Sequence, residues 1–236
     1  SITSTNYNDM GQIASITNGR SNTTRYGYDA NGNVITVTDA AGNSVTTTYD
    51  ANGNVVSTRD HNGNVTKYEY DANNQLVKET DALGNSTTYS YDADGNLVKT
   101  VTPMGNANNY TYDERGQMVS EADPLNHVTG YTYDELGRVI TTTFADGTTN
   151  SFTYDANGRL LTTTDEIGVT ISYVYDKDGR LISFTNGRGY STTYTYDAVG
   201  NMTATTDALD GVTSKTYDAN GNLTSETNAL GNTTKY

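Results

Sequence analysis

The sequence predicts an all-β fold built from one repeated strand–turn–strand–turn unit, and three observations carry this prediction. A tyrosine that opens a motif close to Tyr-Asp-x-x-Gly-x-apolar returns every 21 positions in eleven copies. Each repeat contains two turn signals and two strand signals, and no stretch with helical periodicity. Apolar residues make up only 33% of the chain, with three Phe and no Trp, which is too little for a thick two-layer core. We therefore expect a single curved layer of strands.

The repeat that begins at Tyr70 shows how its first half is specified. Residues 71–74 read as a turn, because Asp bonds nearby backbone amides and Gly or Asn tolerates a positive φ angle. Gly occupies the fourth position in ten of the eleven copies, and Asn74 is the exception. Residues 76–80 follow as a short strand, since their side chains suit a pleated sheet.

The second half of the repeat holds a second turn and a return strand. Residues 81–85 form that turn, whose sequence varies more between copies than that of the first and which contains both prolines of the chain, Pro103 and Pro124. Residues 86–91 alternate, so that Tyr89 and Tyr91 lie on one face and Ser90 on the other. The two tyrosines of each repeat should therefore form rows along one face of the sheet.

About twenty-two short strands are expected, and two geometries fit them. An antiparallel ribbon would twist by about 20° per strand pair and coil into a spiral wall around a hollow. A parallel β-solenoid with one coil per repeat is the alternative. In either case we expect residues 1–236 to be a single array of eleven 21-residue repeats. The chain begins in mid-repeat and its end copies are not polar caps, so we expect a segment of a longer chain.

Composition limits the classes of function. The formal net charge of −14 argues against binding nucleic acid through its phosphates. No apolar run approaches the roughly 20 residues of a membrane-spanning helix. Cysteine is absent, which excludes disulfides, thiolate nucleophiles and cysteine-type zinc sites.

The repeated motif resembles the YD repeat of the RHS (rearrangement hotspot) family. The segments Tyr154-Asp155-Ala156-Asn157-Gly158-Arg159-Leu160 and Tyr175-Asp176-Lys177-Asp178-Gly179-Arg180-Leu181 carry the resemblance most closely, and it extends over the whole chain. The family comprises bacterial RHS toxins, shells of insecticidal toxin complexes, wall-associated proteins and the teneurins. Membership implies antiparallel β-hairpins that wind into a hollow shell, which in toxins encloses a cytotoxic C-terminal domain. The resemblance thus favours the antiparallel ribbon over the solenoid.

Two features depart from the family's toxins. Their repeats precede a self-cleavage segment with an Asp-Pro-x-Gly-type site, whereas the one Asp-Pro here, Asp123-Pro124, stands in a second turn and is followed by Leu125-Asn126. We do not transfer that activity. The register is also strictly constant, and identical units stacked by one operation generate an open helix, so an open tube or filament competes with a closed shell.

The candidate site residues are structural positions of the repeat rather than catalytic groups, and we expect no catalytic, cofactor-binding or metal-binding residue. They are Tyr28, Asp29, Gly32, Tyr91, Asp92, Gly95, Leu97, Tyr154, Asp155, Gly158, Leu160, Tyr196, Asp197 and Gly200. The aspartates are expected to cap turn backbone, with calcium at the Asp-rich turns as the alternative. The tyrosine rows are expected to pack across strands, with a platform for sugar rings as the alternative. His61 and His127 are expected to be surface turn residues.

These expectations combine into one leading hypothesis. The protein is expected to be non-enzymatic and structural, without a cofactor, and to form the wall of an extracellular shell, tube or filament on a bacterial surface. Its partners would be further copies of the repeat, through self-association or continuation of the chain. The alternatives are an adhesive module that binds carbohydrate through glycan contacts, and the encapsulating shell of an RHS-type toxin whose cargo domain lies outside this segment. Neither nucleic acid nor a membrane span is expected.

Overall fold

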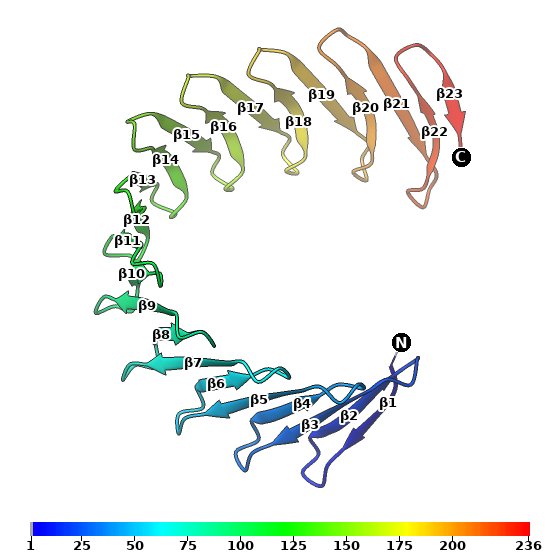
Figure 1. Cartoon of the computed structure of the whole chain (residues 1–236). Coiled ribbons are helices and arrows are strands. Elements are labelled where there is room, and N and C mark those ends of the chain that lie inside the picture. Colours follow the sequence, from blue (N-terminus) through cyan, green and yellow to red (C-terminus); the bar gives the residue numbers. More distant parts are fainter. Residues whose placement is uncertain (1) are drawn as a thin grey trace. The chain divides into compact units, whose positions relative to one another are not determined.

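The computed structural model describes residues 2–236, which form 23 β-strands and no helix. The strands fall into two compact units, Ser1–Asn126 and His127–Tyr236. Figure 1 shows that the strands follow one another in chain order within each unit. The prediction of an all-β fold is therefore confirmed. Residues 2–236 form no helix of the length and apolar character that a membrane span requires.

Strand boundaries repeat with the period of the sequence. The first unit contains β1 (Ile2–Tyr7), β2 (Ile13–Asn18), β3 (Thr23–Tyr28), β4 (Val34–Thr38), β5 (Ser44–Tyr49), β6 (Val55–Arg59), β7 (Val65–Tyr70), β8 (Leu76–Thr80), β9 (Ser86–Tyr91), β10 (Leu97–Val101), β11 (Ala107–Tyr112) and β12 (Met118–Ala122). The second contains β13 (Val128–Tyr133), β14 (Val139–Thr143), β15 (Thr149–Tyr154), β16 (Leu160–Thr164), β17 (Thr170–Tyr175), β18 (Leu181–Thr185), β19 (Ser191–Tyr196), β20 (Met202–Thr206), β21 (Val212–Tyr217), β22 (Leu223–Thr227) and β23 (Thr233–Lys235).

Strand pairing decides between the two expected geometries. Within each unit, the strands pair with their neighbours in chain order, and every pairing is antiparallel. A solenoid would stack each strand in parallel on its equivalent in the next coil. The parallel β-solenoid alternative is therefore wrong, and the array is a series of hairpins.

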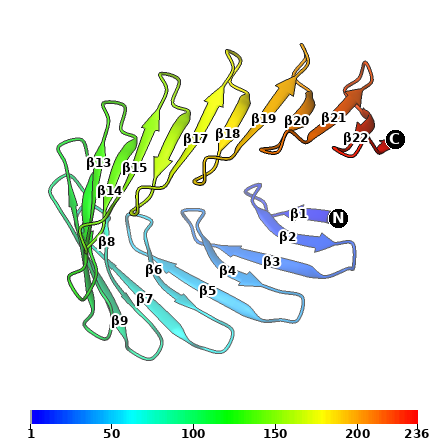
Figure 2. The same cartoon turned by 90° about the horizontal axis from the view of Figure 1, so that it is seen from above.

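The hairpins turn alternately at the two ends of the strands. Within each unit, the turns that follow the motif tyrosine, such as residues 92–96, lie at one side, which we call the first-turn rim. The turns that precede the return strand, such as residues 81–85, lie at the opposite side, the second-turn rim. Figure 2 shows the two sets of turns at opposite ends of the strands.

A β-bulge distinguishes the two kinds of hairpin. At the first-turn rim, Leu97 pairs with Tyr91 but Lys99 pairs with Ser90, so Val98 is an extra residue in β10. The same shift recurs in equivalent hairpins, for example between Val139 and Thr141 in β14. A bulge places two residues opposite one and increases the local twist. Leu97 and Val98 are both half-buried whereas Lys99 is exposed, which fits two adjacent apolar side chains on one face.

The sheet has no enclosed core. None of the described side chains whose burial is defined reaches the fully buried class. In β9, the side chains of Thr87, Tyr89 and Tyr91 are half-buried, and those of Thr88 and Ser90 are exposed. The predicted alternation of the return strand and the predicted single layer are thus both confirmed, and we call the face that carries Tyr89 and Tyr91 the tyrosine face. Most of the five-residue strands, such as β8, are half-buried at every position.

Candidate functional site

The first turn is closed by its aspartate. The Asp92 carbonyl accepts the Gly95 amide at 3.2 Å. Asp92 Oδ1 accepts the amides of Asp94 at 3.0 Å and Asn96 at 2.8 Å, and Oδ2 accepts the Asn96 side-chain amide at 3.0 Å. Gly95 has a φ of +89°, the left-handed conformation that ends this type of three-residue hairpin loop. Asp92 therefore caps turn backbone, as the sequence predicts.

The other candidate turn residues have the same geometry. Asp29, Asp155 and Asp197 each accept the amides of the second and fourth following residues. The φ angles of Gly32, Gly158 and Gly200 are +90°, +87° and +100°. Asn74 replaces glycine with a φ of +62°, as predicted for the left-handed position.

The second turns vary in sequence but not in backbone geometry. Thr102 opens one of them and still accepts the Gly105 amide at 2.9 Å, with Pro103 between them. Asn126 and Asp210 stand in the glycine position with φ of +62° and +63°. The backbone therefore tolerates replacement of each turn residue as long as one residue adopts the left-handed conformation.

These hydrogen bonds hold the turn carboxylates in the charged form. The side-chain amides of Asn33, Asn96 and Asn201 are the main cause that lowers the pKa of Asp29, Asp92 and Asp197. For Asp155 the main cause is the backbone amide of Arg159, which also lowers the pKa. Across residues 2–236, no three or more His, Cys, Asp or Glu side chains cluster in a way that could hold a metal ion. Calcium at these turns stays a prediction.

The motif tyrosine connects consecutive repeats. The Tyr91 hydroxyl donates to the Leu76 carbonyl at 2.9 Å. Between β8 and β9 the backbone ladder consists of three pairs and stops at Lys78 and Thr88, so Leu76 has no ladder partner in β9. The tyrosine side chain spans this open end of the ladder and provides a donor for the Leu76 carbonyl.

The same bond recurs along both units. The hydroxyl-to-carbonyl pairs are Tyr28 with Ile13, Tyr49 with Val34, Tyr70 with Val55, Tyr112 with Leu97, Tyr154 with Val139, Tyr196 with Leu181 and Tyr217 with Met202. Their lengths fall between 2.8 and 3.0 Å. Burial raises the pKa of Tyr70 and Tyr112, which keeps these hydroxyls protonated and able to donate.

Cross-strand aromatic packing is expected of the tyrosine rows, and one pair shows it. The rings of Tyr173 in β17 and Phe184 in β18 lie directly opposite each other, with 5.6 Å between their centroids. The motif tyrosines also bond through their hydroxyls, as Tyr91 does. Ring packing along the rest of the rows stays a prediction.

An arginine reinforces three consecutive repeats of the second unit. Arg159 bonds Asp155 in its own turn at 2.6 Å and donates from Nη1 to the Asp176 carbonyl of the next repeat at 3.2 Å. Its guanidinium also lies 4.9 Å from the centroid of the Tyr175 ring. Arg138 and Arg180 make the same three contacts, with Tyr154 and Tyr196 as the rings.

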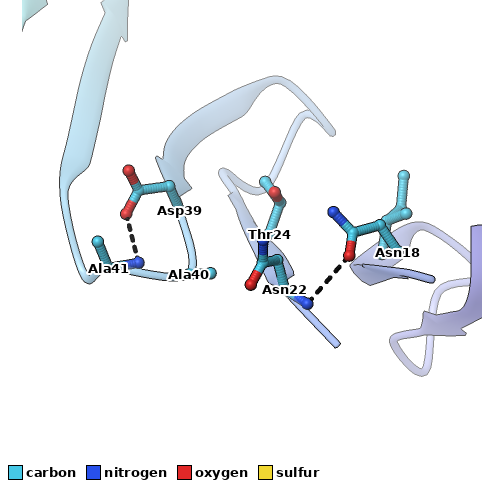
Figure 3. A pocket seen from close by; sticks show the side chains of 7 residues that line it. Asn18, Asn22, Thr24, Asp39, Ala40 and Ala41 are labelled. Carbon is cyan, nitrogen blue, oxygen red and sulfur yellow. Dashed lines mark hydrogen bonds between the residues drawn. The ribbon is translucent and has the colours of Figure 1, made fainter. Parts of the chain in front are cut away.

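Shallow cavities line the second-turn rim between neighbouring turns. One of about 540 Å³ is bounded by Asn18, Asn22 and Thr24 on one wall and by Asp39 and Ala41 on the other. Figure 3 shows these side chains and the turn hydrogen bonds that hold Asn18 and Asp39. Two further cavities of about 320 and 340 Å³ occupy the same position in other repeats, beside His61 and beside Tyr190.

The repeated turn, the hydroxyl bond and the hairpin ladder together describe one structural unit, and comparison with known proteins identifies it. Residues 2–152 match the family model of the teneurin YD-shell. The chain belongs to the YD-shell family. Residues 154–183, 175–213 and 217–236 match the RHS repeat model, which covers most of the remaining YD repeats.

Solved structures share the fold of this YD-repeat chain. Two crystal structures of TcdB2-TccC3, one of them without the hypervariable C-terminal region, are 17% identical to it with TM-scores of 0.54 and 0.55. A Photorhabdus luminescens Tc holotoxin pore is 14% identical with a TM-score of 0.50. These matches cover 95–96% of the YD-repeat chain but only 15–17% of the larger chains. No curated protein matches the sequence.

Proposed function

We propose that this YD-repeat chain forms part of the wall of an extracellular shell, tube or filament and has no enzymatic activity. The observation that supports this most strongly is the repeated bond between the motif tyrosine and the preceding repeat, as in Tyr91 to Leu76. This bond joins each hairpin to the next, and the array has no enclosed core that has to be completed. The number of repeats is therefore not limited by the size of a closed interior. A wall of any length can be extended in this way.

The local geometry supports a curved wall. Neighbouring first-turn hairpins are linked by a side chain at the first-turn rim, while backbone pairing continues to the second-turn rim. Bulges such as that at Val98 add twist at one end of each hairpin only. Because the bulge recurs at the same place in successive hairpins of a unit, each of them adds twist in the same sense.

Exposed apolar turn tips support self-association or contact with further copies of the repeat. Leu83, Met104 and Leu125 occupy the same position in three successive second turns, and their exposed fractions are 87%, 87% and 74%. Large apolar side chains gathered in a row on a surface mark interaction sites. The second-turn rim would then pack against another winding of the wall.

A toxin shell is a more specific version of this function. TcdB2-TccC3 and the Tc holotoxin pore are among the solved structures that share the fold, and this likeness to toxin complexes favours a wall that encloses a cargo. The YD-repeat chain corresponds to about 15% of the TcdB2-TccC3 chain, so a cargo domain would be contributed by other segments.

Carbohydrate binding is a second candidate, and one residue favours it. The tyrosine rows are half-buried and bond through their hydroxyls, so they are poorly suited to act as a platform. Tyr190, in contrast, is the one tyrosine outside the two repeated positions; it is 53% exposed and lies in a cavity of about 340 Å³ with Ser191 and Thr193. A ring beside hydroxyls is a suitable surface for a sugar. Titration with a glycan panel, using a Tyr190→Ala variant as the control, tests it.

Electron microscopy of the native full-length protein tests the leading proposal. Hollow bodies or tubes whose wall is one sheet thick are expected. Tubes of uniform width would identify a surface filament, and closed hollow particles would identify a shell. Solid globular particles without an internal space would contradict both forms of the proposal.

A further inference from the structure

Three repeats depart from the others at one position beside the second-turn rim. The position directly before the second turn is Thr in eight of the eleven copies, and the other three carry Arg59, Val101 and Ala122. Arg59, in β6, is the charged one of the three. Where Thr occupies this position its hydroxyl often bonds the first residue of the return strand, as Thr38 does with Ser44 at 2.8 Å. In the repeat that carries Arg59 the corresponding pair is Arg59 and Val65, which cannot form that bond. Departures from local regularity are where functional residues are expected.

Arg59 lies beside a cavity that contains further donors. The cavity of about 320 Å³ is lined by Arg59, His61, Ser44 and Thr46, among others. Thr46 lies directly opposite Arg59 in the pairing of β5 and β6. The guanidinium rests against the Gly63 backbone, because a Cβ atom built there would lie 3.3 Å from Nη2. Arg59 is exposed at the end of β6, and its guanidinium occupies the space that a side chain at position 63 would take.

The charge of Arg59 is not neutralised within the described residues. The chain has 28 acidic and 14 basic residues, yet the Arg59 guanidinium makes no ion pair or hydrogen bond in the described part of the molecule. The nearby Asp60 carboxylate is already occupied by the amides of Asn62 and Asn64 and by the Asn64 side chain at 2.7 Å. Because the Asp60 carboxylate is engaged in the turn, it does not pair with Arg59, and the N–H groups of the Arg59 guanidinium are available to an external group.

We propose that this cavity binds an oxyanion, a carboxylate, sulfate or phosphate carried by a small molecule. Guanidinium presents paired N–H donors that match the two oxygens of such a group. The His61 imidazole and the Thr46 hydroxyl supply further donors around the same space, whereas the Ser44 hydroxyl is shared with Thr38. A long polyanion is disfavoured, because the net charge of −14 repels it beyond this cavity.

The chain contains its own control for this inference. The cavity beside Tyr190 lies seven repeats later, with Ser191, Thr193 and Thr206 in the positions of Ser44, Thr46 and Arg59. Asp207 and Ala208 there replace Asp60 and His61, and Asp210 replaces Gly63. The two cavities have nearly the same volume, about 320 and 340 Å³. The second lacks any cationic side chain in its lining and should not bind an anion.

Titration with inorganic phosphate, followed by amide chemical shifts, tests the proposal. Saturable shifts are expected at Ser44 and Gly63 and not at Ser191 and Asp210. Arg59→Thr should weaken the apparent affinity at least tenfold, and His61→Ala about threefold. Because Thr is the residue of most other copies, Arg59→Thr should retain the native far-UV circular dichroism spectrum, which separates loss of binding from loss of folding.

Parallel titrations with sulfate, acetate and glucuronate distinguish the source of the oxyanion. Glucuronate binding at least tenfold tighter than acetate would identify an acidic sugar as the ligand class. Equal affinities would identify a free small oxyanion. Unchanged phosphate affinity in folded Arg59→Thr, or equal phosphate shifts in the two cavities, would overturn the proposal. The wall proposal is independent of this result, because it depends on the tyrosine face.

Discussion

The Tyr91 hydroxyl donates a 2.9 Å hydrogen bond to the Leu76 carbonyl, which lies fifteen residues earlier in the preceding hairpin. The two strands that carry these residues share only three backbone pairs, all toward the second-turn rim. The side-chain bond therefore closes the part of the interface that the ladder does not reach. Repetition of this contact makes the array continuous in the absence of a buried core.

Removal of this hydroxyl should weaken the array locally. Tyr91→Phe keeps the ring but leaves the Leu76 carbonyl without its donor, and we expect a loss of about 0.5–1.5 kcal/mol in the free energy of unfolding. Urea denaturation of the purified chain measures it. The matched control is Tyr175→Phe, because Tyr175 occupies the same repeat position and its hydroxyl makes no hydrogen bond in the described residues. Equal losses in the two variants would show that the hydroxyl bond is not the source of the stability.

The left-handed turn glycines should resist substitution. Gly95 and Gly158 have φ of +89° and +87°, so replacement of either by Ala should cost about 1–2 kcal/mol. Gly27 lies within β3, and a Cβ atom there would meet Thr36 at an ordinary distance of 3.5 Å. Gly27→Ala should therefore stay close to the parent protein in thermal unfolding. A Gly27→Ala loss as large as that of Gly95→Ala would contradict the assigned turn geometry.

The arginine contacts should stiffen the second unit. Arg159→Asn introduces the residue type found at the equivalent Asn96 and Asn201, and it removes both the bond to the Asp176 carbonyl and the contact with the Tyr175 ring. Faster amide hydrogen exchange is expected in β16 and β17, with exchange of β3 to β8 unchanged. Arg188→Asn is the control, because that side chain lies exposed in a second turn and makes no ion pair. Unaltered exchange in β16 and β17 would show that the stacked arginine is dispensable.

Low pH should destabilise the array because it protonates the turn aspartates. The pKa values of Asp29, Asp92 and Asp197 are lowered in the folded state by turn hydrogen bonds. Such groups stabilise the fold above their unfolded pKa of about 3.9, and this contribution is lost as pH falls through the lower folded pKa. The urea midpoint should therefore start to fall near pH 4 and decrease further toward pH 2.

Two variants test the origin of this acid sensitivity. Asp92→Asn should show a shallower decrease with pH than the parent protein, because one stabilising carboxylate is absent. Asp94→Asn should follow the parent curve, since the Asp94 carboxylate makes no turn hydrogen bond while its amide donates to Asp92. A decrease that begins at pH 6 in the parent protein would assign the sensitivity to other groups.

The period of the sequence was sufficient to locate strands and turns. The 21-residue spacing, the glycine or Asn74 in the turns and the alternation around Tyr89 predicted the observed boundaries within a few residues. These features depend on local conformational preferences, which one repeat expresses and eleven repeats reinforce. The choice between antiparallel hairpins and a solenoid required the resemblance to YD repeats, because both geometries use the same local signals.

The contacts between repeats could not be predicted in the same way. The bond from Tyr91 to Leu76 depends on which strands pair and where their ladder ends. The bulge at Val98 has only a faint signal, two adjacent apolar residues at the start of a strand. The sequence shows that the position after the turn glycine carries Arg in some copies and Asn in others. The stacking of Arg159 on Tyr175, however, depends on the pairing register between repeats, which the sequence does not specify.

Nitration of tyrosine, mapped by mass spectrometry, tests the central claim most directly. If the repeated tyrosines hold the wall together, Tyr190 should react rapidly along with the exposed end copies Tyr7 and Tyr236, which are 53%, 62% and 72% exposed. Half-buried, hydrogen-bonded tyrosines such as Tyr91 and Tyr154 should react slowly. Reaction of Tyr91 and Tyr154 as fast as Tyr190 in the folded protein would contradict the account, since it would make the tyrosine face an open platform.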